Sequence, residues 1–255
     1  MINVLFAGDI VGSRGCDFAE DTVRRLKGKE KIDIVIVNGE NSADGNGITK
    51  RSMEQIFSFA DVITTGNHCF RRKEFTEYYD IKGNLLRPAN YPDGVAGHGV
   101  CVLDMGAYSF AVINLMGTAF MEPLNNPFEC IDRLLEDIHT PNILVDFHAE
   151  ATSEKKAMGF YLAGKVSAVI GTHTHVQTAD EIILNDHTGY ITDAGMCGAE
   201  LSVLGVKSEL AIEKQRFKCP VRFTESDNPP FFCGVLMTID EKCGKMHSIK
   251  RLMIR

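Results

Sequence analysis

Polar residues of the kinds that bind metal ions follow five strand-like apolar runs of this chain. These residues are Asp9, the pair Glu40-Asn41, the pair Asn67-His68, then His148, and finally His173 and His175. Each stands at or just past the end of a run rich in Val, Ile and Leu, a composition typical of strands buried on both faces. In a parallel sheet the carboxyl ends of the strands meet at one edge, where α/β proteins place their ligands. The pattern therefore predicts an α/β fold with a functional site at that edge.

Apolar runs with the character of strands alternate with helical patterns through most of the chain. We expect strands over residues 3–7, 33–37, 62–65, 100–105, 109–115, 143–147 and 168–170. Between them we expect four helices: one capped by Asp17, one capped by Thr49, one that begins at Asn126-Pro127, and one over residues 153–163. Past His175 we expect strands over 181–184, 189–192, 232–239 and 246–254, with a helix over 208–215. Because no linker or repeat divides residues 1–255, the sequence predicts one domain in which two sheets pack together with helices outside.

The composition excludes several classes of protein. A net charge of −7 argues against the basic stripe that a long nucleic-acid footprint needs, but it allows a small phosphorylated substrate. No run of about 18 apolar residues is present, so we expect no membrane span. The first six residues lack the basic segment of a signal peptide, so we expect a cytoplasmic protein. The eight cysteines include no C-x-x-C pair, and we expect reduced thiols that act as small apolar side chains.

The candidate ligands are carboxylate, amide and imidazole groups, which hard cations prefer to thiolates. Glu40 has two oxygens and can bridge two ions. Asp9, Asn41 and one of the paired histidines would then complete one ion, and Asn67, His148 and the other histidine would complete the second. If the backbone is extended there, the rings of His173 and His175 point the same way, so one ring can serve each ion. Two ions about 3.5–4 Å apart can clamp a phosphate and generate a hydroxide between them.

Charge and proton transfer indicate a phosphodiester substrate. Two divalent ions with Asp9, Glu40 and a bridging hydroxide keep a charge of about +1, which suits a phosphodiester monoanion. His68 adjoins the candidate ligand Asn67, and an imidazole at that place can protonate a leaving alkoxide near neutral pH. Arg71 lies a few residues further on and is a candidate for substrate contact, although a solvated helix start is the more ordinary explanation for a cluster of basic residues there.

The order of these motifs resembles that of the calcineurin-like metallophosphoesterase superfamily, and within it that of the bacterial YmdB-like phosphodiesterases. The motifs that carry the resemblance are GDIVG at 8–12, NGEN at 38–41, LRPANYP at 86–92, VINLMG at 112–117, DFHAEAT at 146–152, GTHTHVQT at 171–178 and TDAGM at 192–196. The resemblance implies a four-layer α/β/β/α sandwich, homo-oligomers and activity on cyclic nucleotides. It also implies that Glu40 bridges the two metal ions, that His68 is the acid, and that the metal is iron, with manganese or zinc as alternatives.

Two positions depart from these patterns. The superfamily normally has Asp-x-His at its first motif, whereas this chain has Val11 at the histidine position. In YmdB-like proteins an asparagine that corresponds to Asn41 replaces that histidine. After Gly-Asn-His the family usually continues Thr-Trp-Asp, whereas this chain continues Cys69-Phe70-Arg71. Arg71 in place of an acid would tighten phosphate binding or shift the substrate preference.

From the residues and the resemblance together, we expect a dinuclear-metal phosphodiesterase that hydrolyses small 2′,3′- or 3′,5′-cyclic nucleotides. A metal-bridging hydroxide would attack the phosphorus while His68 protonates the leaving ribose oxygen. Two alternatives stay open. One is a phosphomonoesterase, and the other is a nucleotide-sensing signalling protein that binds a partner and turns over slowly.

Overall fold

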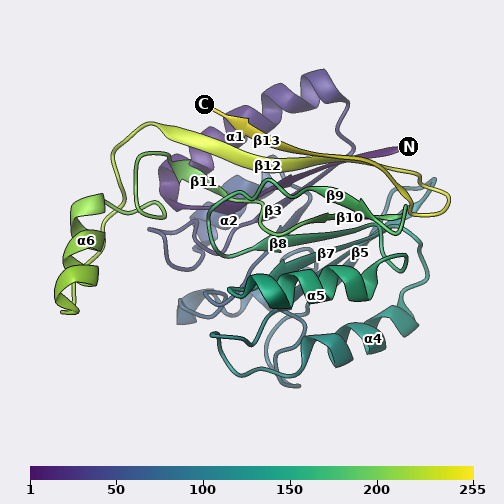
Figure 1. Ribbon diagram of the computed structural model, residues 1–255, viewed down its shortest axis with the longest axis horizontal. Helices are drawn as coiled ribbons and strands as arrows, with labels where there is room; N and C mark the ends of the chain where they lie inside the picture. Colours follow the sequence, from purple (N-terminus) through teal and green to yellow (C-terminus); the bar gives the residue numbers. More distant parts are fainter.

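The computed structural model describes residues 1–255 as two β-sheets that face each other, with helices on both outer faces (Figure 1). The first sheet has seven strands in the order β2-β11-β12-β1-β3-β4, with β13 paired to β12. Three of its strands form a parallel set that ends at one edge: β1 (Ile2–Ala7), β3 (Ile34–Asn38) and β4 (Val62–Thr64). The long β12 (Pro230–Ile239) runs antiparallel to β1 and to β13 (Met246–Ile254). The short β2 (Asp9–Ile10) and β11 (Met196–Ala199) extend this sheet beyond the end of β1.

The second sheet has six strands in the order β5-β6-β7-β8-β10-β9. Four central strands are parallel: β6 (Ser109–Met116), β7 (Ile143–His148), β8 (Ala168–Thr172) and β10 (Thr188–Ile191). The edge strands β5 (Val100–Asp104) and β9 (Ile182–Leu184) are antiparallel to their neighbours. Both sheets therefore present the carboxyl ends of several parallel strands, which is the arrangement that the sequence predicts.

Helices cover the outer faces of both sheets. α1 (Gly12–Glu30) and α2 (Lys50–Phe57) pack on the first sheet, and α4 (Pro127–Asp137) and α5 (Thr152–Leu162) pack on the second. α6 (Ser208–Phe217) stands apart from these layers at the left of Figure 1. A 3₁₀ turn, η1 (Lys73–Phe75), and the short α3 (Tyr78–Ile81) follow β4. No helix is both long and apolar enough to cross a membrane.

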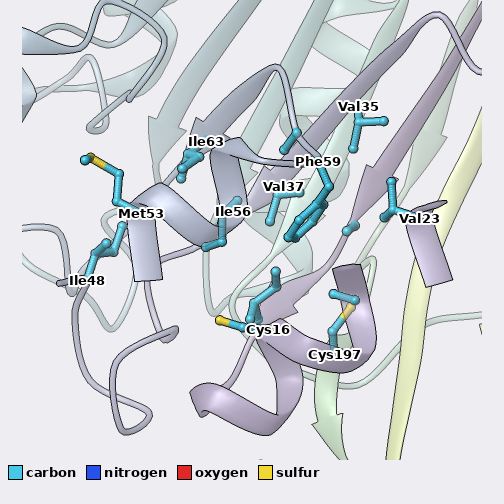
Figure 2. Packing of buried hydrophobic residues seen from close by; sticks show 14 of the residues in the cluster. Cys16, Val23, Val35, Val37, Ile48, Met53, Ile56, Phe59, Ile63 and Cys197 are labelled. Carbon is cyan, nitrogen blue, oxygen red and sulfur yellow. The ribbon is translucent and has the colours of Figure 1, made fainter. Parts of the chain in front are cut away.

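Three buried apolar clusters hold these layers together. Along β3, Val35 and Val37 point toward α1 and α2, where they belong to a cluster of 20 residues (Figure 2). The intervening Ile34 and Ile36 belong to a cluster of 18 residues between the two sheets. A third cluster of 14 residues joins the second sheet to α4 and α5. Because alternate residues of a strand point to opposite faces, a continuous apolar run fills two of these interfaces at once. The predicted four-layer α/β/β/α sandwich is confirmed.

Local side-chain hydrogen bonds cap the starts of two helices, α2 and α4. The hydroxyl of Thr49 accepts a hydrogen bond from the backbone N–H of Ser52, and Asn126 accepts one from Phe128, as the capping patterns predict. The predicted cap at Asp17 is wrong, because α1 begins five residues earlier, at Gly12. The backbone N–H of Gly12 donates to the carbonyl of Asn41, so a tertiary contact fixes this helix start. The sequence patterns also missed β2 and β11, which have only two and four residues.

Candidate metal centre

The structure brings all seven predicted ligands to the carboxyl ends of parallel strands from both sheets. Asp9 lies in β2, directly after β1, and Glu40 and Asn41 follow β3. Asn67 follows β4, His148 is the last residue of β7, and His173 and His175 follow β8. The two sheets thus contribute opposite walls of one site, although the residues come from positions 9 to 175 of the chain.

One half of the site forms around the Nε2 atom of His148. This atom lies 3.2 Å from Oε1 of Glu40, 2.9 Å from Oδ1 of Asn67 and 3.1 Å from Nδ1 of His173. Glu40 and His148 are buried, and one ligand atom from each of Glu40, His148 and His173 lies within 4.8 Å of the others. These are separations at which the side chains can share one ion.

The other half of the site forms around the Nε2 atom of His175. This atom lies 3.2 Å from the amide of Asn41 and 3.8 Å from Oδ1 of Asp9. Glu40 lies between the two halves, because its Oε1 atom accepts a hydrogen bond from the Asn41 amide at 3.3 Å and also contacts His148. The contacts thus group these side chains into the two sets around Glu40 that the sequence predicts, and their roles as ligands stay predictions.

The loop that carries the paired histidines is not extended, contrary to the premise of the sequence argument. Both His173 and His175 have positive φ angles, 103° and 64°. Non-glycine residues rarely adopt such angles unless the surroundings hold them there. Asp193 provides that support, because its carboxylate accepts hydrogen bonds from the backbone N–H and the hydroxyl of Thr174. The two rings consequently face different halves of the site, a geometry that the turn creates rather than a strand.

The buried carboxylates provide a test of whether the site fits a cation. Asp9 is fully buried, and its Oδ1 atom has no hydrogen-bond partner in the protein. Burial raises the pKa of Asp9 well above its usual value, and the nearby Glu40 and Asp193 raise it further, against the opposing effect of His148. An unpartnered buried carboxylate oxygen is costly unless a cation neutralises it. The donor set of oxygen and imidazole nitrogen atoms therefore fits hard or borderline metal ions.

The protonation of His148 leads to the same conclusion. Burial by itself lowers the pKa of His148, but the carboxylates of Glu40, Asp9 and Asp146 outweigh it and raise the pKa to about 9. Burial likewise raises the pKa of Glu40, yet His148 and His68 bring it down to about 2. The His148 imidazolium thus neutralises the carboxylates of Glu40 and Asp9. A bound metal ion can take over this role, because a histidine that ligates a metal gives up its extra proton.

The opposite side of the His148 ring is fixed by residues to which the sequence argument assigned no role. The hydroxyl of Thr172 donates to Oδ1 of Asp146 at 2.7 Å and so accepts from Nδ1 of His148 at 2.9 Å. Oδ2 of Asp146 accepts from Thr64 at 2.5 Å and from Asn38 at 3.1 Å. This arrangement keeps a proton on Nδ1, so that Nε2 is the atom that can give up its proton and direct a lone pair at a metal ion. A signal was present, since Asp146 is an acid inside an otherwise apolar buried strand, two residues before His148.

His68 and Cys69 occupy different environments beside the ligands. Nδ1 of His68 lies 2.7 Å from Oδ1 of Asn41, and its backbone N–H donates to Glu40 at 2.9 Å. Burial lowers the pKa of His68, Glu40 opposes this effect, and Arg71 adds to it. The thiol of Cys69 is buried and hydrogen-bonded to Tyr91, and burial raises its pKa to about 12. Cys69 is therefore a buried thiol hydrogen-bonded to Tyr91.

Arg71 is exposed and lines a cavity of about 790 Å³ that also borders Asn67 and His173. This location agrees with the predicted contact to substrate, which stays a prediction.

Comparisons with known proteins agree with this site and fold. The chain is 44% identical over 256 residues to the 2′,3′-cyclic-nucleotide 2′-phosphodiesterase of Bacillus subtilis (strain 168), with 99% of this chain and 97% of that one covered. The crystal structure of a hypothetical protein from Thermus thermophilus matches with a TM-score of 0.93 at 35% identity, over 99% of this chain and 98% of that one. A structure described as a novel phosphatase from Mycoplasma pneumoniae matches with a TM-score of 0.95 at 32% identity, over 99% and 93% of the two chains. A family model described as YmdB-like protein matches residues 5–252, and this chain belongs to that family.

Proposed function

We propose that this protein is a metal-dependent phosphodiesterase that hydrolyses small cyclic nucleotides. Among the candidate substrates we rank 2′,3′-cyclic nucleotides first and 3′,5′-cyclic nucleotides second. The observation that carries the proposal is the cluster in which the buried Glu40 and His148 meet the partly buried His173 beside the unpartnered oxygen of Asp9. Its enzyme class, a phosphoric diester hydrolase, rests on the relative from Bacillus subtilis that is 44% identical over nearly the whole of both chains.

The contacts support two neighbouring metal ions. Asp9, Asn41 and His175 would hold one ion, and Asn67, His148 and His173 would hold the other, with Glu40 shared between them. When bound, such a pair of ions supplies Lewis acidity and a source of hydroxide near neutral pH. Because the ligands are oxygen and nitrogen atoms, iron, manganese and zinc all suit the site, and iron is our first choice.

The chain itself would supply the proton for the leaving group. Nδ1 of His68 is held against Asn41, and the backbone of His68 is held against Glu40. The ring is therefore fixed beside the cluster while its side chain keeps 25% of its surface exposed to solvent and substrate. Protonation of a departing ribose oxygen by Nε2 of His68 would be ordinary general acid catalysis.

The cationic groups around the site suit a monoanionic diester better than a dianionic monoester. Arg71 lines the cavity, whereas Arg72 is hydrogen-bonded to the carbonyl of Ala43 and paired with Asp44. The ammonium group of Lys155 is buried against Asp193. Arg71 is thus the one Lys or Arg in the cavity lining, which also contains the acid Glu122, so the chain supplies few cations for a dianionic monoester.

The test is a substrate panel on the purified protein with its metals measured by elemental analysis. We expect turnover of 2′,3′-cyclic AMP that disappears after chelation and returns when iron, manganese or zinc is added. We also expect bis(p-nitrophenyl) phosphate to be hydrolysed faster than p-nitrophenyl phosphate. A protein that hydrolyses only the monoester would contradict the proposal. Retention of nucleotide binding with negligible turnover would favour a sensing role.

A further inference from the structure

The cavity of about 790 Å³ beside the candidate metal centre is lined by two kinds of residue. It borders Asn67 and His173, so it opens directly onto the predicted ligands. Its lining also includes three aromatic rings, those of Phe70, Tyr91 and Phe120. Its volume lies within the range of about 300–1,000 Å³ typical of small-molecule sites. A ligand that suits this lining carries both a phosphate and a flat apolar group.

Phe120 stands out among these rings because it is 93% exposed. Its φ angle is +62°, an unfavourable conformation for an aromatic residue. The preceding residues are anchored, since the backbone N–H groups of Thr118 and Ala119 donate to the carboxylate of Glu154 at 2.9 and 3.3 Å. The loop after β6 therefore holds an apolar ring out into solvent at the rim of the cavity, where the faces of the ring are available to a ligand.

Two other aromatic rings of the lining, those of Phe70 and Tyr91, are packed in place. The ring of Tyr91 packs edge-on against Phe70 at 5.3 Å between centroids, with an interplanar angle of 87°, and its hydroxyl is hydrogen-bonded to Cys69. Phe70 in turn packs against Tyr79, which is fully buried. Fixed aromatic walls of this kind favour flat ligands, because little conformational entropy is lost when such a ligand binds.

We propose that this cavity is the nucleoside subsite and that the base of the substrate stacks on Phe120. The proposal rests on the proposed function and adds to it the group that selects nucleotides over other diesters. Stacking a base on an aromatic side chain is worth about 1–3 kcal/mol and tolerates any base, because each base has a π-face. The base would cover apolar surface of Phe120 that otherwise contacts water.

The position of His68 is compatible with this placement. His68 lines a second cavity of about 590 Å³, on the side of Leu204 and Phe223. A 2′,3′-cyclic phosphate carries both ester oxygens on one ribose, so the ribose stays beside the phosphorus whichever cavity the base enters. Asn67 and His68 are consecutive residues, and one borders each cavity. A ribose at the boundary of the two cavities can therefore lie beside His68 while its base stacks on Phe120.

The experiment compares ligands with and without a base. Calorimetry on the metal-containing protein gives the dissociation constants of 3′-AMP and methyl phosphate, and the ratio of the methyl phosphate constant to the 3′-AMP constant measures the contribution of the nucleoside. In Phe120→Ala this ratio is expected to fall roughly 5- to 150-fold, the equivalent of the stacking free energy. Phe120→Trp is expected to restore the ratio, because it restores a ring. Phe223→Ala removes a 48% exposed ring from the second cavity and serves as the matched control.

The possible outcomes separate this proposal from the proposed function. An unchanged ratio in Phe120→Ala overturns the nucleoside subsite, and so does a fall in Phe223→Ala alone, which would place the base in the second cavity. An altered oligomeric state of Phe120→Ala with an unchanged ratio of dissociation constants overturns the nucleoside subsite as well, because Phe120 would then contact a second copy of the chain. Failure of the proposed function gives a different result: 2′,3′-cyclic AMP is not hydrolysed, while 3′-AMP still binds more tightly than methyl phosphate.

Discussion

The ammonium group of Lys155 lies 2.7 Å from Oδ2 of Asp193, and both side chains are 1% exposed. The same carboxylate accepts hydrogen bonds from the backbone N–H of Thr174 at 3.0 Å and from its hydroxyl at 2.8 Å. Its other oxygen accepts from the backbone N–H of Gly195 at 2.8 Å. This ion pair joins α5 to the loop between His173 and His175, so it supports two predicted ligands without contacting either ring.

Lys155→Met is expected to lower the free energy of unfolding by about 3–5 kcal/mol, because it leaves a buried carboxylate without its cation. Lys156→Met is the matched control. Lys156 is 50% exposed and lies 3.4 Å from Asp180, so its loss should cost less than about 1 kcal/mol. Urea denaturation of both variants measures the difference. Equal effects for the two neighbouring lysines would contradict a special role for the buried pair.

His68→Ala is expected to keep the metal content and to lower turnover of 2′,3′-cyclic AMP by about 10²–10⁴-fold. Metal is expected to be retained because His68 is not among the predicted ligands, and alanine preserves the backbone N–H that donates to Glu40. The effect should be much smaller with bis(p-nitrophenyl) phosphate, whose leaving group needs no proton. Elemental analysis and the two rates measure this, and an unaltered rate with the cyclic nucleotide would rule out the acid role.

Asp9→Asn should change stability in opposite directions with and without metal. In chelator, the variant should unfold at a higher urea concentration than the wild type, because it removes a buried carboxylate whose Oδ1 atom has no partner. The raised pKa of Asp9 has the same physical cause, because burial disfavours its charged form. With metal present, the variant should unfold at a lower urea concentration and contain less metal. Full metal content in this variant would count against Asp9 as a ligand.

Gly66→Ala is expected to displace His148 and to reduce metal content. A Cβ atom at position 66 would lie 2.1 Å from Cδ2 and 2.3 Å from Nε2 of His148, closer than atoms can approach. Gly28→Ala in α1 is the control, since nothing lies within 4 Å of a Cβ there, and alanine should stabilise the helix by about 1 kcal/mol. Normal metal content in Gly66→Ala would show that His148 can move without harm to the site.

The sequence by itself determined the layers of the fold, the family of the chain and the group of residues that meet at the candidate metal centre. The periodicity of apolar residues over a short stretch sets which side of a strand is buried. A ligand that follows an apolar run lies at the end of a strand, independently of the rest of the fold. For the same reason the caps at Thr49 and Asn126 were predictable, because their partners lie within three residues. The roles of the ligands, the identity of the metal, the cytoplasmic location and the homo-oligomer stay predictions.

Only the tertiary structure decided how the ligands are held. The backbone of His173 donates to Asp9 across 164 residues of chain, and Asp193 bonds Thr174 while it is paired with Lys155 from another helix. These contacts stabilise left-handed backbone angles at His173 and His175 that local preferences disfavour. The start of α1 at Gly12 is likewise set by the distant carbonyl of Asn41. Local patterns encode hydrophobic burial and capping, whereas the cost of unusual backbone angles and buried charge is offset only by partners that folding brings together.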